Sequence, residues 1–204
     1  MILKNGTVVQ GAKVILNGCT LTVYDDCGVI DKLWDGVTLL GSETSQYPIT
    51  NTFQPILKML NNSLIEYAVF GVNSQYGGIL MALNSDFTDN VNGVVYDFFN
   101  SSVNIPPHTN RNASYIRKCD FRTTDILYTD KNSYPGTFIS ASYASRLDLS
   151  GITMDNVSST TAVNKRGNGI RSDFTQINLT SYCSNPSCSN EIRSEIKNLK
   201  IGAT

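Results

Sequence analysis

Two stretches of the sequence nearly repeat each other: NSLIEYAVFGV, residues 62–72, and NSDFTDNVNGV, residues 84–94. They start 22 residues apart, and Asn, Ser, Val, Gly and Val stand at the same places in both. The large apolar Ile65 of the first stretch corresponds to Phe87 of the second. A fixed period of this length is typical of stacked repeat units, so further copies are expected along the chain.

The same register fits four other stretches: NGCTLTV (17–23), KCDFRTTDI (118–126), GITMDN (151–156) and RSEIKNLKIGA (193–203). One large apolar position is shared by all six copies, and it is occupied in chain order by Leu21, Ile65, Phe87, Phe121, Met154 and Ile196. The longer intervals correspond to one unit plus an insertion of roughly 10 or 20 residues, as loops in repeat proteins commonly supply.

The apolar residues within a unit alternate with polar ones, which predicts strands with one face in a core. GGILMALNSDF, residues 77–87, is an example of this alternation. Several units end in a Gly-Val or Gly-Ile pair, which suits a chain that turns a corner and then extends as a strand. The pairs are Gly36-Val37, Gly71-Val72, Gly93-Val94 and Gly169-Ile170.

Short strands and corners within about 22 residues predict one coil of a parallel β-helix, a solenoid in which like residues stack in ladders. We predict an all-β fold of roughly six such coils with loop insertions. Asn17, Asn61 or Asn62, and Asn84 are placed to form a ladder at one corner. An antiparallel sandwich is the alternative, because alternation and turn signals also fit that fold.

Composition agrees with a turn-rich β protein and excludes two classes of function. Charged residues make up 16% of the chain and the net charge is −1, so no basic stripe for nucleic acid is expected. No segment approaches the ~18 apolar residues of a membrane helix. We expect residues 1–204 to form a single β-helix domain. Both ends look cut and no signal peptide is apparent, so we expect a fragment of a longer chain; a partner that covers the open end is the alternative.

The order of several segments resembles right-handed β-helix regions of large exported cell-surface proteins of Bacteroidetes. The segments are residues 31–46, 56–72, 77–94, 115–157 and 166–179. The resemblance implies a right-handed helix, an extracellular or cell-surface location, and export by the type IX secretion route. It implies further coils or a C-terminal sorting domain as partners within the same chain. Such proteins are adhesin-like, and the resemblance implies no catalytic residue.

Cysteine and histidine offer little catalytic chemistry. Cys183 and Cys188 flank the turn SNPS and are candidates for a disulfide, and Cys19 and Cys27 are a second candidate pair. Free thiols are the alternative for both pairs. Cys119 is left over and is expected to be a small buried residue. The single histidine, His108, lies in a Pro-rich stretch typical of a solvated loop, and no His-based or four-Cys metal site is expected.

Carboxylates offer the most serious enzymatic interpretation. Asp86 and Asp120 share a register position, so they are expected to stack on adjacent coils about 4.8 Å apart. Two carboxylates this close repel each other, which raises the pKa of one of them unless a cation binds between them. Calcium is the candidate cation. Lys118 and Arg122 lie close to them in sequence. The alternative is that these residues are solvated ladder positions, and no other cofactor is expected.

Loop insertions often hold the recognition surface of a solenoid. The expected loops are 42–55, 99–114, 128–136 and 158–168. In the third, YTDKNSYP, an aromatic ring could stack on a sugar while polar groups bind its hydroxyls. The candidate ligand-binding residues are Tyr128, Asp130, Asn132 and Tyr134. A plain turn before Pro135 is the alternative.

These observations favour a non-enzymatic extracellular module, adhesin-like or a rigid spacer, whose loops bind glycans or molecules of host and cell surfaces. The alternative is a carbohydrate-active enzyme, a polysaccharide lyase or glycoside hydrolase, because both occur on β-helices and use carboxylates. A trimeric, tailspike-like receptor-binding protein is a third class.

Overall fold

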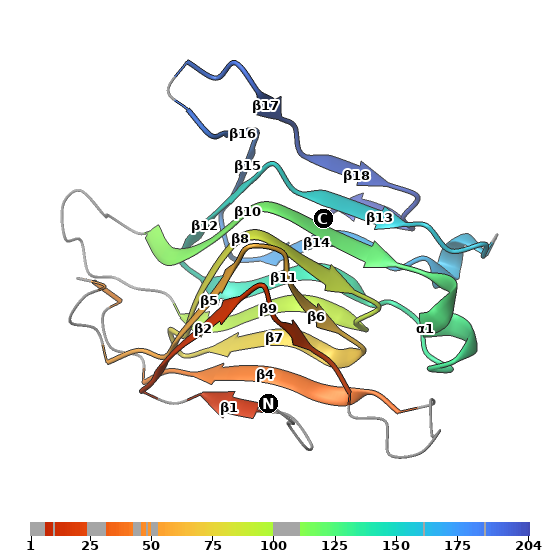
Figure 1. Cartoon of the computed structure of the whole chain (residues 1–204), viewed down its shortest axis with the longest axis horizontal. Coiled ribbons are helices and arrows are strands. Elements are labelled where there is room, and N and C mark those ends of the chain that lie inside the picture. The colour runs from red at the N-terminus through yellow and green to blue at the C-terminus, as the bar shows by residue number, and fades with distance from the viewer. Residues whose placement is uncertain are drawn as a thin grey trace.

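A computed structural model describes residues 7–9, 11–23, 32–42, 46, 47, 49, 53–99, 111–160, 162–185 and 187–204. These residues form two large parallel sheets that face each other (Figure 1). The seven-stranded sheet contains, in spatial order, β1 (Thr7–Val9), β4 (Trp34–Leu40), β7 (Ala68–Gln75), β9 (Asn92–Phe99), β11 (Thr137–Ala144), β14 (Asn168–Asp173) and β19 (Ile201–Ala203).

The ten-stranded sheet has two limbs that meet at a corner. One limb contains β2 (Lys13–Asn17), β5 (Ile56–Leu60), β8 (Ile79–Thr88), β10 (Arg111–Thr123), β12 (Arg146–Ser150) and β15 (Ile177–Thr180). The other contains β3 (Thr20–Leu21), β6 (Ser63–Glu66), β13 (Thr153–Asn156) and β18 (Glu195–Lys197), and the long strands β8 and β10 continue into it.

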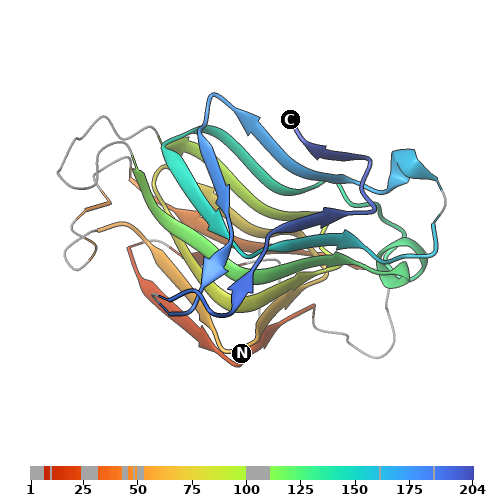
Figure 2. The ribbon, with the colours of Figure 1, turned by 90° about the horizontal axis from the view of Figure 1, so that it is seen from above.

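Every strand pairing in the two large sheets is parallel, so the described residues exclude the antiparallel sandwich. The strands of the seven-stranded sheet follow one another in chain order, and the chain visits the ten-stranded sheet between them. Seen from above in Figure 2, the later strands (blue) lie over the earlier ones. The prediction of an all-β fold with parallel strands is confirmed.

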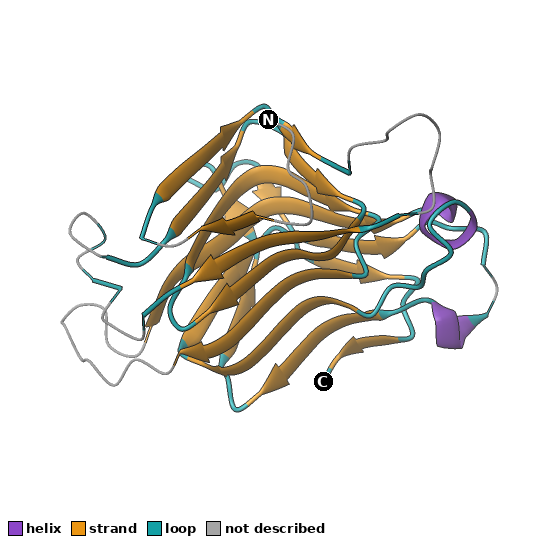
Figure 3. Ribbon diagram, turned by 90° about the horizontal axis from the view of Figure 1, so that it is seen from below, coloured by secondary structure: helices purple, strands orange, loops and turns teal. Residues whose placement is uncertain are grey.

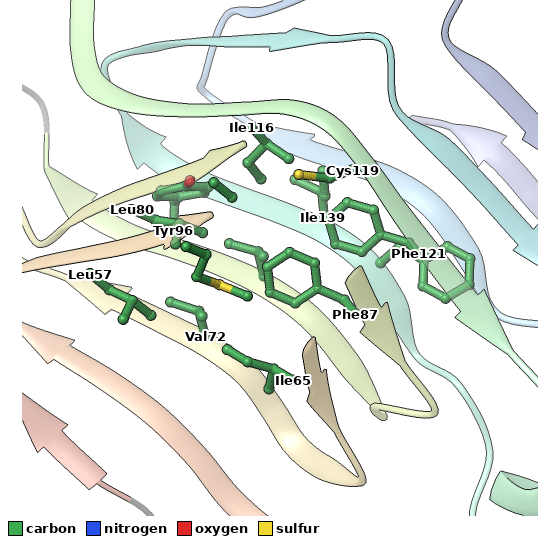
Figure 4. Packing of buried hydrophobic residues seen from close by; sticks show 14 of the residues in the cluster. Leu57, Ile65, Val72, Leu80, Phe87, Tyr96, Ile116, Cys119, Phe121 and Ile139 are labelled. Atoms are coloured by element: carbon green, nitrogen blue, oxygen red, sulfur yellow. The ribbon is translucent and has the colours of Figure 1, made fainter. Parts of the chain in front are cut away.

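The predicted apolar register is one continuous column of paired residues. The pairings run from Leu21 to Ile65, Phe87, Phe121, Met154 and Ile196. Phe87 and Phe121 are fully buried, and their rings stack with centroids 4.7 Å apart (Figure 4). A second buried column in the seven-stranded sheet faces this one: Val37, Val72, Val94, Ile139 and Ile170. Each fully buried large side chain contributes about 1.5–3 kcal/mol relative to exposure, so these columns dominate the stability.

Asparagine residues line one corner, as predicted. Asn61 Nδ2 donates to Asn17 Oδ1 at 2.6 Å, and Asn84 Nδ2 donates to Asn62 Oδ1 at 2.5 Å. Asn61, Asn62 and Asn84 all have φ between 50° and 60°. This left-handed conformation turns the chain sharply, and Asn adopts it more readily than most residues.

A second corner carries a ladder of aromatic rings that the sequence did not predict. Its rings are Tyr76, Phe98, Tyr143 and Phe174, and we call it the aromatic ladder. Their φ values lie between 50° and 54°, and successive rings stack with centroids 4.8–6.3 Å apart. The ladder lies on the surface, since Phe98 is 53%, Tyr143 48% and Phe174 82% exposed. Because its rings contact one another from one passage of the chain to the next, the ladder is a structural element of the corner.

The glycines of the Gly-Val pairs permit close backbone approach at the start of their strands. A Cβ added at Gly71 would lie 2.6 Å from the carbonyl oxygen of Gly93, and one at Gly93 would lie 2.5 Å from that of Phe138. No side chain fits at such distances, which explains the repeated glycine.

Two short helical segments lie side by side at one edge of the stack (Figure 3). They are α1 (Asp125–Thr129) and a 3-10 turn, Val163–Lys165. The remaining element is a small antiparallel hairpin formed by β16 (Tyr182–Cys183) and β17 (Glu191–Ile192), which projects beyond the stack in Figure 1.

Candidate binding groove

The hairpin β16–β17 leaves the stack at the corner where earlier passages of the chain turn with one or two residues. A hydrogen bond from Ser194 Oγ to the carbonyl oxygen of Thr180, 2.7 Å, closes the base of the excursion. The backbone N–H of Gly151 also donates to Thr180, at 3.0 Å. Cys183 and Cys188, a predicted pair, are joined in a disulfide with their Cα atoms 5.0 Å apart. The hairpin is thus tied at both its base and its tip.

A hollow of about 380 Å³ lies between this hairpin and the outer face of the first limb. We call it the arginine hollow. It is lined by Arg117, Arg146, Asp148, Ser150, Asn178, Thr180, Ser181, Tyr182 and Cys183. The strands β10, β12 and β15 place these side chains, because residues that alternate with them point into the core. Leu147 and Leu149, for example, are buried beside the outward-facing Asp148.

The two arginines of the arginine hollow are incompletely paired among the described residues. Arg146 Nε lies 3.6 Å from Asp148 Oδ1 and has no hydrogen-bond partner there although that atom is buried. Asn178 Nδ2 donates to the same carboxylate oxygen at 3.2 Å. The Arg117 guanidinium lies 4.5 Å above the ring of Tyr115, which orients it. Two guanidinium groups therefore face a single carboxylate.

A second hollow of about 300 Å³ lies on the other side of the hairpin base. We call it the acidic hollow. It is lined by Asn62, Asn84, Asp86, Lys118, Asp120, Gly151, Thr153 and Ile192. Ile192 belongs to β17, so the hairpin contributes to both hollows. Both hollows are lined by outward-facing residues of the ten-stranded sheet and by residues at the hairpin base, and we call the two hollows together the groove.

The predicted register of Asp86 and Asp120 is confirmed, since the two residues pair directly on β8 and β10. Partial burial raises the pKa of the Asp86 carboxyl group, and the charge of Asp120 raises it further, while Arg122 opposes this. Arg122 forms a 2.8 Å ion pair with Asp120. Within the part of the chain that the structure describes, no three His, Cys, Asp or Glu residues gather closely enough to hold a metal ion.

The predicted ligand-binding residues lie on and after α1. The phenol of Tyr128 donates to the carbonyl oxygen of Lys165 at 2.8 Å and accepts from Asn156 Nδ2 at 2.7 Å. Tyr128 therefore joins α1 to the 3-10 turn rather than offering its hydroxyl to a ligand. Its ring lies 5.7 Å from that of Tyr134, over which Lys165 Nζ sits at 4.7 Å.

The two polar members of that predicted set are exposed. Asp130 Oδ1 accepts a hydrogen bond from the neighbouring Thr129 hydroxyl at 2.7 Å. Asn132 adopts a φ of 45°, which marks it as a turn residue. The structure thus brings Tyr128 and Tyr134 together and makes Asn132 part of the turn.

The other cysteines have contrasting surroundings. Cys119 is buried and pairs in register with Ser85, as predicted, and burial raises the pKa of its thiol to about 12. Cys19 is exposed and has no disulfide partner among the described residues. Cys27 and His108 lie outside the described residues, as does most of the predicted loop 99–114.

The sequence reasoning did not single out Arg117 or Arg146. A signal for both was present, because the strand pattern around them places each on the polar face. The strand pattern does not predict that the segment 181–194 lies against the polar face that carries Arg117 and Arg146.

No described helix is long and apolar enough to cross a membrane. Comparisons with known proteins give no family assignment: no family model matches the chain, and no curated protein or solved structure matches it.

Proposed function

We propose that the protein is a right-handed parallel β-helix of roughly six coils that serves as a non-enzymatic, extracellular glycan-binding module. The parallel sheets, visited alternately by the chain, support the solenoid. The adhesin-like character and the link to exported Bacteroidetes surface proteins rest on the resemblance of the sequence. The proposal includes further coils or a sorting domain of the same chain as partners of this module.

One observation carries the binding proposal: the groove beneath the hairpin β16–β17 is lined by charged, amide and hydroxyl groups held on paired strands. Groups on strands keep their geometry better than groups on loops, which favours recognition of a ligand rich in hydroxyls. Tyr182 adds an aromatic surface of the kind that packs against a sugar ring. The groove replaces the loop 128–136 as the favoured site, because Tyr128 is already engaged.

The hairpin disulfide supports an extracellular location. Disulfides persist mainly in oxidising compartments, and Cys183–Cys188 closes a short surface segment with no buried core around it.

The test is a screen of the purified protein against acidic and neutral oligosaccharides, followed by calorimetry on each ligand found. We expect binding that Tyr182→Ala weakens about tenfold, with Tyr143→Ala of the aromatic ladder as a matched control that leaves binding unchanged. Absence of binding across the panel contradicts the proposal.

The acidic hollow favours a second candidate, a polysaccharide lyase or glycoside hydrolase. Asp86 carries a raised pKa beside Asp120, with Lys118 lining the same hollow. Such a carboxyl pair suits proton transfer or calcium binding.

Incubation with acidic and neutral polysaccharides, with and without calcium, distinguishes the candidates. New reducing ends or unsaturated products that disappear with Asp120→Asn would establish the enzyme. Under the leading proposal, neither the unchanged protein nor the variant Asp120→Asn forms any product.

A further inference from the structure

We infer that the arginine hollow is the subsite for one anionic sugar unit, whose carboxylate or sulfate group binds between Arg117 and Arg146. This inference rests on the proposed glycan binding and adds the chemical class of the ligand. It rests on the placement of the two guanidinium groups in one hollow. Among the described residues, Arg146 Nε has no hydrogen-bond partner and Arg117 has no ion-pair partner.

The first step is the charge of the hollow. Its lining contains two arginines and a single carboxylate, Asp148. Asp148 also accepts a hydrogen bond from the Asn178 amide, which is neutral and adds no charge to the hollow. The hollow keeps an excess of positive charge on a protein whose net charge is −1. An anionic group is therefore the ligand that this local field attracts.

The second step is the state of the two guanidinium groups. Arg146 has a buried Nε with no acceptor among the described residues, while its side chain as a whole is 40% exposed. Its outer N–H groups can reach a ligand. Arg117 makes no ion pair with any described residue, and its guanidinium carbon lies over the Tyr115 ring. Stacking leaves the N–H edge of a guanidinium free for a planar or tetrahedral anion.

The third step is the surrounding hydroxyl and amide groups. Ser150, Thr180 and Ser181 line the same hollow, and they suit the hydroxyl groups of a sugar rather than a bare inorganic ion. Tyr182 closes the side formed by the hairpin. The combination of two cations, hydroxyls and one ring matches an acidic monosaccharide within a chain.

The neighbouring acidic hollow limits what the rest of that chain can be. Asp86 and Asp120 would repel a second anionic unit placed beside them. We therefore expect a glycan that carries an anionic unit next to a neutral one to bind more tightly than a uniform polyuronate.

The experiment uses the whole chain and calorimetric titration with defined oligosaccharides. The carboxylate arm compares glucuronate-containing oligosaccharides that alternate with neutral sugars, their carboxyl-reduced forms, and oligogalacturonate. The sulfate arm compares sulfated oligosaccharides with their desulfated forms. We expect loss of the anionic group in either arm to weaken binding about tenfold or more.

The variants are Arg117→Gln and Arg146→Gln, each expected to weaken binding of the anionic ligand about tenfold and to leave the neutral form unaffected. Arg146→Lys keeps the charge but loses the planar fork, so an intermediate loss is expected if folding is intact. Arg171→Gln is the matched control, because Arg171 lies on β14 in the other sheet and is paired with Asp173. It should bind like the unchanged protein.

The outcomes distinguish failure of the anionic subsite from failure of the proposed glycan binding. Binding of neutral glycans that equals binding of acidic ones, and that survives Arg117→Gln and Arg146→Gln, overturns the anionic subsite and leaves glycan binding standing. No binding of any glycan contradicts both. Equal losses in Arg171→Gln would assign the effect to overall charge and would also overturn the subsite.

Discussion

Phe121 and Phe174 are the same residue type in opposite surroundings. Phe121 is fully buried in the apolar column and stacks on Phe87. Phe174 is 82% exposed and is the last ring of the aromatic ladder. The difference follows from backbone position, since Phe121 faces inward on β10 whereas Phe174 turns a corner with a φ of 54°.

We expect Phe121→Ala to lower the free energy of unfolding by about 3–5 kcal/mol, because it removes apolar burial and leaves a cavity. Phe174→Ala should cost about 1 kcal/mol or less, since it removes one partly solvated ring contact. Urea denaturation of both variants measures the difference. Similar losses would mean that the apolar column does not dominate stability.

The second residue-scale prediction concerns Asp86. Its pKa in the folded protein is raised above the ordinary value of 3.8, by burial first and then by Asp120. The folded protein then holds this proton more tightly than the unfolded chain, so stability falls as the pH rises from 3.8 through the raised pKa. Asp86→Asn should therefore stabilise the protein at neutral pH and have little effect below that window.

The gain should be about 1 kcal/mol or less, because the group is only partly buried and solvent screens it. Thermal unfolding followed across acid and neutral pH checks this. The control is Asp35→Asn, since Asp35 is exposed. Equal behaviour of the two variants at every pH would count against the burial effect.

At the scale of elements, α1 is held by its N-cap residue, Thr124, and by the packing of the buried Leu127. Thr124 Oγ1 accepts from the N–H of Ile126 at 3.2 Å and donates to Asp89 Oδ2 at 2.7 Å. The buried Asp89 also accepts from the N–H of Thr124 at 2.6 Å. A helix of five residues has little stability of its own, so this cap decides whether it forms.

Thr124→Ala should cost about 1 kcal/mol and speed amide exchange in α1, because it removes the cap and one partner of a buried carboxylate. Hydrogen exchange at Leu127 and Tyr128 measures the local effect. Thr129→Ala, an exposed change at the other end of α1, should leave those amides nearly unchanged. Identical exchange in both variants would show that packing of Leu127 alone holds the helix.

At the scale of the whole molecule, each strand contacts mainly the strands directly above and below it. β8 and β10 lie within the ten-stranded sheet, whereas β1 and β19 are the outermost described strands of the other sheet. Stability in such an arrangement is approximately a sum of neighbouring contacts. Inner strands must open several contacts before their amides exchange.

We therefore expect hydrogen exchange to be slowest in β8 and β10 and to become faster toward β1 and β19. Mass-spectrometric exchange of the intact chain gives this profile directly. Uniform exchange rates across all strands would instead indicate one cooperative unit.

Much of the core was predictable because each copy of the repeat places an apolar residue at the same position. Leu21, Ile65 and Phe87 stand at one place in three copies of the unit, and residues of one kind at one place must share a column when copies stack. The same logic placed Asp86 beside Asp120. By contrast, α1 was missed because a helix of one turn leaves no periodic signal, and Tyr76 and Phe98 of the aromatic ladder lie outside the matched motif.

The sequence by itself determined the strand type, the apolar column and the asparagine corner, because alternation and a fixed period depend only on local spacing. Only the tertiary structure decided that Arg117 and Arg146 line one hollow beneath β16–β17. Their meeting depends on strand pairing and on the path of the excursion 181–194, and neither follows from local spacing. The core follows from the repeated sequence pattern, whereas the groove forms where the segment 181–194 interrupts that pattern.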